Sequence, residues 1–474
     1  MGPQTSAVSL EIASLGRLLS VPLISYLSSA VTLCQRDNFP NFFRTVPSDI
    51  HQALAIVALL ERFEWNYASF VHSDSVYGTT GYELVKQAVE KTNNICLADP
   101  VTIYNKQFKD EDYIRVVRTL VKGKNDSSLA KGKNENKMDN GFVTPKVVIV
   151  FADRVPAGKL LQAAKDEGVK DNFMWIGSDA WASRESVVEN KEEFVEGAIA
   201  IHPLRRNLPA YNKYFQRLIN TKNERNPWFE EYLEVYHNCS SDTGKTDRSN
   251  CNEGTQREQV YVHFVRDAVY AYAHALHNLH IDLCGSFVGN KRLCPAFKEN
   301  VFKNLTHYLS KVSFRDTEDN FTFRFYSHDD SYSAHSSVAH DGPPRYSIIN
   351  FAENSTENQT IYDWRTVGTY LDGEIKDIDD EFPTRYQDMA IEKVCNRKEC
   401  EVNHIKIPDT DDQCCWHCQN CGDYKIAKNQ YECIDCALGN RSEISSTDKT
   451  VKCVRIEEVI FIRNLVHNFC TIWF

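Results

Sequence analysis

The cysteines in the C-terminal part of the chain have a spacing that could bind a metal ion. Residues 413–421 read QCCWHCQNC, and Cys433 and Cys436 follow as a further CxxC pair. Two such pairs, Cys415 and Cys418 with Cys433 and Cys436, could hold zinc in a tetrahedral site through four thiolates. The same cysteines could instead form disulfides, and the choice decides in which compartment the protein acts.

Several observations favour disulfides. One zinc site would not use five other cysteines of the same region: Cys395, Cys400, Cys414, Cys421 and Cys453. Upstream, two further pairs are spaced to close short loops, as disulfides do: Cys239/Cys251 and Cys284/Cys294. Seven N-x-S/T glycosylation sequons give weaker support: Asn125, Asn238, Asn304, Asn320, Asn354, Asn358 and Asn440. We therefore expect an extracellular or lumenal glycoprotein, with a zinc-binding intracellular scaffold as the alternative.

The segments that precede this region alternate between strand and helix patterns. Strand-like runs cover residues 21–28, 66–73, 146–152 and 173–179, and helical patterns between them cover 50–63, 79–91 and 155–168. This alternation predicts a parallel sheet in an α/β fold. Helical patterns return at 208–221 and 258–280, and residues 310–385 are strand-like. From about residue 390 the chain has many cysteines and few large apolar residues, which indicates a small module that needs cross-links for stability.

The composition excludes several classes of function. The chain has 474 residues and a net charge of −11, whereas nucleic-acid-binding proteins carry a surplus of Lys and Arg. No run of about eighteen uncharged apolar residues occurs, and Arg463 and His467 interrupt the apolar C-terminal segment, so we expect no membrane span. The chain does not open on a signal-peptide pattern. It also lacks GxSxG, P-loop, HExxH and GxGxxG motifs, so we expect neither an enzyme nor a cofactor.

The motifs along the chain resemble one family of receptors. CCWHCxxC, the later CxxC pair and Cys453 are similar to the cysteine-rich domain of class C G-protein-coupled receptors. VPLISYLSSA, FFRTVPSDIHQA, WNYASFVHSDSVYGTTG, IGSDAW and NPWFEEY resemble the Venus-flytrap domain of metabotropic glutamate receptors. The similarity runs from residue 2 to about residue 453. It implies an α/β, bilobed Venus-flytrap (periplasmic-binding-protein-like) domain, incomplete at its N-terminus, followed by a small disulfide-rich domain.

The resemblance also implies domain boundaries. Lobe 1 would comprise residues 1–46, with its N-terminal portion missing, and residues 203–344. Lobe 2 would comprise residues 47–202, with a return and connection at 345–388. The cysteine-rich domain would follow at 389–455, and residues 456–474 would form an atypical tail. The seven-helix transmembrane domain of the family would be absent from this chain.

Ligand-binding residues follow from the same motifs. A helix that begins at Thr5 and Ser6 would bring hydroxyl and backbone N–H groups to its positive end, which suits a carboxylate. The resemblance assigns the α-carboxylate of an amino acid to Ser6, and both ends of the amino-acid head to Ser29. It assigns the ammonium group to three residues: Asp49, Tyr77 and Asp179. It assigns the distal carboxylate to Lys298, with Arg184 as a second contact. From the residues alone, Ser6 and Asp49 could be plain helix caps and Lys298 a solvated surface lysine.

The implied function is extracellular sensing of glutamate by closure of the cleft between the lobes. The expected partners are L-glutamate or another acidic amino acid, a second copy of the chain bound through lobe 1, and a G protein only through the missing transmembrane domain. The expected location is the extracellular side of the plasma membrane for the full-length receptor. This chain alone would be secreted or a fragment, and a secreted amino-acid-binding decoy is an alternative.

The resemblance finally implies a disulfide pattern and a dimer surface. The pairs would be Cys395–Cys415, Cys400–Cys418, Cys421–Cys433, Cys436–Cys453 and Cys96–Cys414, with Cys34 and Cys470 left over. In the helix predicted at residues 6–20, we expect an apolar stripe to face the lobe core: Val8, Ile12, Leu15 and Leu19. Leu10 and Leu18 lie off this stripe and would contact the second copy.

Overall fold

The computed structural model describes most of the chain. The described residues are 1–92, 95–122, 145–182, 184–219, 225–237, 261–285, 293–318, 320–327, 340–354, 360–371, 373–378, 400–408, 416–445 and 450–456. The chain forms two compact units. One comprises Met1–Ile95 and Pro100–Met389, and the other comprises Cys96–Asp99 and Ala390–Phe474.

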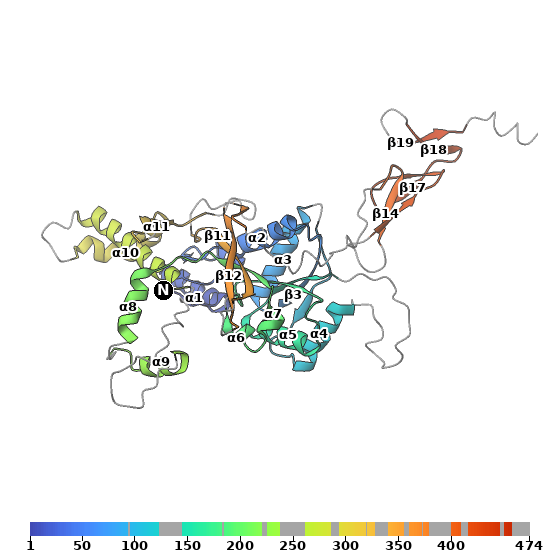
Figure 1. The fold of residues 1–474 in the computed structure, drawn as a ribbon. Coiled ribbons are helices and arrows are strands. Elements are labelled where there is room, and N and C mark those ends of the chain that lie inside the picture. Colours follow the sequence, from blue (N-terminus) through green and yellow to red (C-terminus); the bar gives the residue numbers. More distant parts are fainter. Residues whose placement is uncertain are drawn as a thin grey trace, which may run out of the picture. The chain divides into compact units, whose positions relative to one another are not determined.

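A mixed sheet is the centre of the first unit (Figure 1). Within that unit its order is β13-β12-β11-β8-β7-β6-β3, and β5 also pairs with β3. The strands are β3 (Tyr67–Ser73), β5 (Val101–Ile103), β6 (Val147–Phe151), β7 (Met174–Gly177), β8 (Ile199–Pro203), β11 (Arg345–Glu353), β12 (Tyr362–Leu371) and β13 (Glu374–Lys376). Strands β5, β3, β6, β7 and β8 run parallel, and β11 to β13 add antiparallel pairs. The predicted parallel α/β sheet is therefore confirmed.

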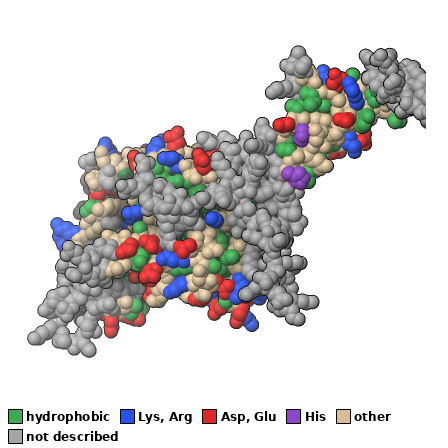
Figure 2. All heavy atoms as spheres, turned by 45° about the vertical axis from the view of Figure 1, so that its right-hand side comes forward, with side chains coloured by type: hydrophobic (Ala, Val, Ile, Leu, Met, Phe, Trp, Pro, Cys, Tyr) green, Lys and Arg blue, Asp and Glu red, His purple; other side chains and the backbone are tan. Residues whose placement is uncertain are grey.

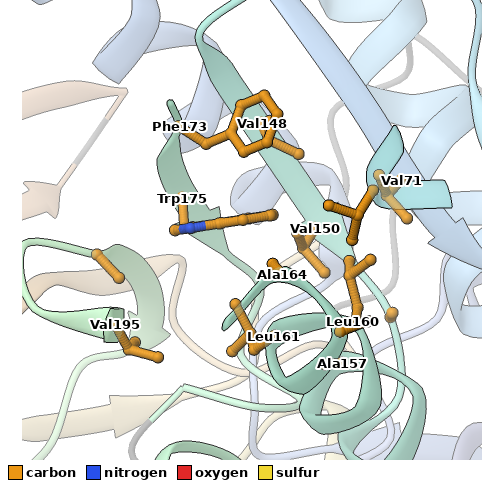
Figure 3. Close-up of a cluster of buried hydrophobic side chains, with 14 of the residues drawn as sticks. Val71, Val148, Val150, Ala157, Leu160, Leu161, Ala164, Phe173, Trp175 and Val195 are labelled. Atoms are coloured by element: carbon orange, nitrogen blue, oxygen red, sulfur yellow. The ribbon is translucent and has the colours of Figure 1, made fainter. Parts of the chain in front are cut away.

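Helices cover this sheet on both sides. Figure 1 shows α2 (Asp49–Arg62) and α3 (Val76–Glu90) on one side, and α4 (Asp110–Lys122) and α5 (Arg154–Asp166) on the other. Every residue of β3 and β6 is buried, as expected for parallel strands between two helical layers. In Figure 3, Val148, Val150 and Trp175 of the strands pack against Leu160 and Leu161 of α5. The short helices α6 (Glu185–Val188) and α7 (Glu192–Val195) add to the same core.

A second core lies outside the sheet. It is formed by α10 (Val262–Cys284), α11 (Pro295–Ser310), β1 (Leu23–Ser25), β2 (Phe42–Arg44), β9 (Ser313–Arg315) and β10 (Thr322–Arg324). The small residues Ala268, Ala271 and Ala275 give α10 a face that packs closely against this core. Helices α8 (Pro209–Ile219) and α9 (Phe229–His237) form their own small cluster. Two separate cores are what two lobes require, although the predicted lobe boundaries stay predictions.

The predicted core face of the first helix is wrong. Helix α1 (Ser6–Leu19) buries its small residues Ser6, Ser9 and Ala13. The predicted core stripe is instead exposed: Val8 by 47%, Ile12 by 41%, Leu15 by 58% and Leu19 by 71%. Leu10, expected to be at a dimer surface, packs partly buried against Ala13, Leu33 and Phe42, while Leu18 is 79% exposed. The reason is close packing, because the Oγ atoms of Ser9 and Ser28 lie 2.7 Å apart and leave room only for small side chains.

The described part of the cysteine-rich module consists of three hairpins. They are β14 (His404–Pro408) with β15 (Trp416–Asn420), β16 (Lys425–Ala427) with β17 (Cys433–Asp435), and β18 (Asn440–Ile444) with β19 (Val451–Arg455). Its disulfides are Cys400–Cys418, Cys421–Cys433 and Cys436–Cys453, the pairs that the resemblance implied. The four-thiolate zinc site is thereby ruled out, because three of its four sulfur atoms are in disulfides.

The remaining cysteines divide into two groups. In the first unit Cys284 is bonded to Cys294, as expected, and Cys34 is a free thiol. Cys96 is in a disulfide, but its predicted partner Cys414 lies outside the described residues. Five other cysteines also lie outside them: Cys239, Cys251, Cys395, Cys415 and Cys470. Their predicted states stay predictions.

The surface carries both signs of charge. On the face in Figure 2, acidic and basic side chains are interspersed over the described residues rather than gathered into one basic area. Within the described ranges no helix is long and apolar enough to span a membrane.

Candidate functional site

Two buried carboxylates mark the candidate site. Asp49 is the first residue of α2, directly after the helix cap Ser48, and Asp179 follows β7. Asp49 is completely buried and Asp179 nearly so. Among the described residues, neither carboxylate oxygen of Asp49 has a hydrogen-bond partner. A buried carboxylate without hydrogen-bond partners is unfavourable, so this arrangement suits a bound cation.

The electrostatics of the pair support this interpretation. Burial, followed by the negative charge of Asp179, raises the pKa of Asp49 to about 8. Ser29 and Arg44 partly oppose that shift. Burial also raises the pKa of Asp179, against the hydrogen bond from Tyr77 and the positive charge of Arg184. A cation bound between the two carboxylates would relieve both shifts, since each carboxylate would regain a charge partner.

Tyr77 is held against the second carboxylate. It is the second residue of α3, and its hydroxyl group donates to Oδ1 of Asp179 over 2.5 Å. Its ring packs on Phe151, with the ring centroids 4.7 Å apart. The following Gly78 allows the close approach of α3, because a Cβ there would overlap the backbone of Ser73. An aromatic ring fixed beside two carboxylates suits an ammonium group, which binds to both.

The two predicted serines lie on segments that meet Asp49. The hydroxyl oxygen of Ser6 accepts from the backbone N–H of Ala30 over 3.2 Å. The carbonyl oxygen of Ser29 accepts from the backbone N–H of Asp49 over 3.0 Å. The side chain of Thr5 makes no capping bond to α1, so first-turn N–H groups of that helix remain open to an anion. The structure therefore brings Ser6, Ser29 and Asp49 into one region.

Arg184 belongs to the same region. It precedes α6, and its positive charge lowers the pKa of Asp179. Its guanidinium carbon lies 4.8 Å from the ring centroid of Tyr261. Tyr261 in turn lies within hydrogen-bond distance of His202 and of the carbonyl oxygen of Asp179. Sequence reasoning missed Tyr261 and His202, since neither belongs to a motif and the two are 59 residues apart.

Unpaired polar atoms gather around the two carboxylates. Gln52 lies one turn after Asp49 in α2, and Ser178 directly precedes Asp179. Within the described part of the chain, these buried atoms have no hydrogen-bond partner: both side-chain polar atoms of Gln52, Oγ of Ser178 and Nε of Arg184. Buried polar atoms are nearly always paired, so an unpaired group at one place indicates a binding site for a polar ligand. Gln52 and Ser178 were also missed from the sequence.

Lys298 is placed differently. It lies in the first turn of α11 and is exposed to solvent. No contact between Lys298 and the two carboxylates is found in the described structure. Its role as a ligand for a distal carboxylate stays a prediction.

The sequons are described in part. Asn304 lies in α11, Asn320 is exposed between β9 and β10, Asn354 directly follows β11, and Asn440 begins β18. Asn125, Asn238 and Asn358 lie outside the described residues. Glycosylation at all seven stays a prediction.

Comparisons with known proteins agree with this architecture. Residues 1–332 match the family model described as "Receptor family ligand binding region". The chain is 29% identical over 460 residues to human metabotropic glutamate receptor 8, covering 94% of this chain and 46% of that protein. It is 30% identical over 455 residues to metabotropic glutamate receptor 4 of Macaca fascicularis, covering 93% and 45%. It is 29% identical over 484 residues to the metabotropic glutamate receptor of Drosophila melanogaster, covering 93% and 46%.

These relatives are receptors by name, and the chain spans about half the length of those it matches. The match confirms the predicted family resemblance and its fold class, a periplasmic-binding-protein-like α/β domain followed by a disulfide-rich region.

Proposed function

Because the chain belongs to the family defined by the receptor ligand binding region, we propose that it senses an extracellular acidic amino acid, L-glutamate above all, through the cluster around Asp49 and Asp179. The observation that carries the proposal is Asp49 itself, fully buried with both oxygens unpaired beside a second carboxylate. The α-ammonium group of an amino acid supplies the missing cation, with three donors for the oxygens of Asp49 and Asp179.

The other end of the amino-acid head has its own partners. The uncapped first turn of α1 and the hydroxyl groups of Ser6 and Ser29 are suited to an α-carboxylate. Arg184, with its Nε unpaired in the described structure, is suited to a further anionic group on the ligand side chain. Lys298 would add a second cation there. Two carboxylates and two cations around one zwitterion favour an acidic side chain over a neutral one.

The binding test compares three ligands on the purified chain. We expect calorimetric titration to give a higher affinity for glutamate than for glutamine or glycine. Asp49→Asn should abolish binding of all three, because the ammonium group loses its main partner. Equal affinity for glutamate and glutamine would refute the acidic ligand, and unchanged binding by Asp49→Asn would refute the site.

Lys298 is tested against a neighbour on the same helix. Lys298→Met should reduce the preference for glutamate over glutamine, whereas Lys303→Met, an exposed lysine elsewhere on α11, should not. If both variants keep the full preference, Lys298 is a solvated surface lysine.

We also propose that two copies of the chain associate through α1. The exposed apolar residues Val8, Ile12, Leu15, Leu18 and Leu19 support this proposal, since soluble proteins seldom leave so many large apolar side chains together in water. Analytical ultracentrifugation should show a dimer for the chain and a monomer for the double variant Leu15→Asp with Leu18→Asp. Tyr214→Asp, at an exposed apolar position in α8, should remain dimeric. A monomeric unmodified chain would contradict the proposal.

In the full-length protein, ligand binding would be passed through the cysteine-rich module to a seven-helix domain and a G protein. Joining this chain to the seven-helix segment of one of its relatives tests the coupling. Glutamate should then raise G-protein activity in cells, and Asp49→Asn should remove the response.

A further inference from the structure

His202 and Tyr261 form a buried hydrogen-bond chain beside the proposed ligand site. His202 lies in β8 and is almost fully buried. Its Nδ1 atom is 2.8 Å from the carbonyl oxygen of Pro203, and its Nε2 atom is 3.0 Å from the hydroxyl oxygen of Tyr261. Tyr261 immediately precedes α10, which belongs to the second core, whereas His202 belongs to the sheet.

This geometry fixes the direction of each hydrogen bond. A carbonyl oxygen can only accept, so Nδ1 of His202 carries the hydrogen atom. Burial lowers the pKa of His202 to about 3, so the ring is neutral and Nε2 must accept. The hydroxyl group of Tyr261 therefore donates to Nε2, the nearer acceptor, rather than to the carbonyl oxygen of Asp179 at 3.3 Å. The orientation of the Tyr261 ring is set by this bond.

The ring of Tyr261 in turn holds Arg184. The guanidinium carbon lies 4.8 Å from the ring centroid, within the range of a cation–π interaction. Tyr261 also lies beside Asp179, because its hydroxyl oxygen is 3.3 Å from the backbone carbonyl oxygen of Asp179. No ion pair joins Arg184 to Asp179 among the described residues, although an arginine and a buried carboxylate that share a neighbour would ordinarily pair. Stacking on Tyr261 thus keeps the guanidinium group from occupying the carboxylate that the ligand ammonium group needs.

We propose that Tyr261, oriented by His202, is a positioning residue that holds Arg184 away from Asp179 and directs its guanidinium group, whose Nε is unpaired among the described residues, to an anionic group on the ligand side chain. This proposal rests on the function proposed above. It makes Tyr261 a determinant of specificity through Arg184, because only an anionic ligand side chain contacts that guanidinium group. An effect of Tyr261 on Asp179 would weaken binding of glutamate and glutamine alike and leave their affinity ratio unchanged, and Tyr77 still holds Asp179 through its own hydrogen bond.

The test measures the ratio of glutamate affinity to glutamine affinity. Tyr261→Leu removes the ring and the hydroxyl group, and we expect the ratio to fall by about tenfold, the size of one charge-assisted hydrogen bond. Tyr261→Phe keeps the ring but loses the bond to His202, and we expect a smaller fall. In an Arg184→Met background, Tyr261→Leu should change the ratio no further, since the residue through which it acts is gone.

Tyr270→Leu is the matched control. Tyr270 lies on the same helix and also stacks with an arginine, Arg266, at 5.8 Å, but it takes no part in the site. Tyr270→Leu should leave the ratio of glutamate affinity to glutamine affinity unchanged. An equal loss of both ligands in Tyr261→Phe, or a further fall of the ratio in the Arg184→Met background, would overturn the proposal. Failure of the proposed function is recognised separately, because the unmodified chain would then bind neither amino acid.

Discussion

The guanidinium group of Arg44 and the carboxylate of Asp341 form a buried ion pair, with Nε and Oδ1 2.7 Å apart. Arg44 ends β2, and Asp341 lies four residues before β11. The NH1 group of Arg44 also donates to the carbonyl oxygens of Ser29 and Ala30, over 2.7 and 3.0 Å. One side chain therefore ties the segment that carries Ser29 to the connection that enters the sheet.

Arg44→Met should destabilise the protein by about 3–5 kcal/mol, because it leaves the carboxylate of Asp341 buried with less of its charge compensated. Chemical denaturation measures the change in the free energy of unfolding. Arg36→Met is the control, since Arg36 pairs with the same carboxylate over 3.1 Å but is partly exposed. We expect Arg36→Met to cost about 1 kcal/mol. Equal losses in the free energy of unfolding for the two variants would show that Arg44 stabilises the fold no more than Arg36 does.

The stability of the unliganded protein should fall as the pH rises from about 4 to about 8. The pKa of Asp49 is 3.8 in the unfolded chain and about 8 in the folded one, so between these values only the folded state holds the proton. The slope is up to about 1.4 kcal/mol per pH unit. Asp49→Asn should flatten the profile and raise the stability at pH 8. Asp74→Asn, which also removes a carboxyl group but at an exposed position, is the control variant.

The affinity for the ligand should show the opposite dependence on pH. An ammonium group binds to ionised Asp49, so affinity should rise with pH toward 8 and then level off. Titrations at pH 7 in two buffers with different ionisation enthalpies should reveal a proton released on binding. No proton release at that pH would mean that Asp49 is already ionised in the free protein.

The sequence predicted the parallel strands β3, β6 and β7, and four predicted disulfides are present among the described residues, because both depend on local patterns. The buried strands β3 and β6 are continuous apolar runs, and the pairing of Cys421 with Cys433 follows a spacing shared with a family. The core-facing side of α1 was not predictable in this way. Apolar periodicity predicts that Val8 and Ile12 face the core, but the helix packs through its small residues. The cause is the close contact with Ser28, which is distant in the sequence.

The same distinction between local patterns and long-range packing applies to the residues of the candidate site. Asp49, Tyr77 and Asp179 lie in recognisable motifs at helix starts and strand ends, and the structure brings them together. His202 and Tyr261 have no motif, and they meet only because the sheet and α10 fold together. Chemistry built from long-range contacts between ordinary residues has no local pattern in the sequence.

Gly342→Ala should strongly destabilise the connection into β11. A Cβ atom at Gly342 would overlap the backbone carbonyl group of Thr45, and backbone cannot move aside as a side chain can. We expect a loss of about 1–3 kcal/mol or more in the free energy of unfolding. Gly158→Ala in α5 is the control, because its nearest neighbour would be 3.7 Å from the new Cβ. That change should be neutral or stabilising by up to about 1 kcal/mol.

The cysteine-rich module should depend on its disulfides far more than the first unit does. Within its described residues only Asn403, Ile405 and Cys421 are buried, too few for a hydrophobic core. Replacing Cys421 and Cys433 by Ser should therefore destabilise the module by about 2–5 kcal/mol. Hydrogen exchange should show faster exchange in β16 and β17 of that variant.

The same replacement at Cys284 and Cys294 is the comparison, because that disulfide joins α10 and α11, which already share an apolar core. We expect that removing this disulfide leaves the amide hydrogens of both helices protected from exchange. The exchange rates in the cysteine-rich module should not change. If loss of Cys421–Cys433 leaves β16 and β17 protected as well, the hairpins are stable without the cross-link. Stability would then have to come from polar contacts, such as the side-chain amide of Asn403, which donates to the carbonyl oxygen of Lys425 and accepts from the N–H of Ala427.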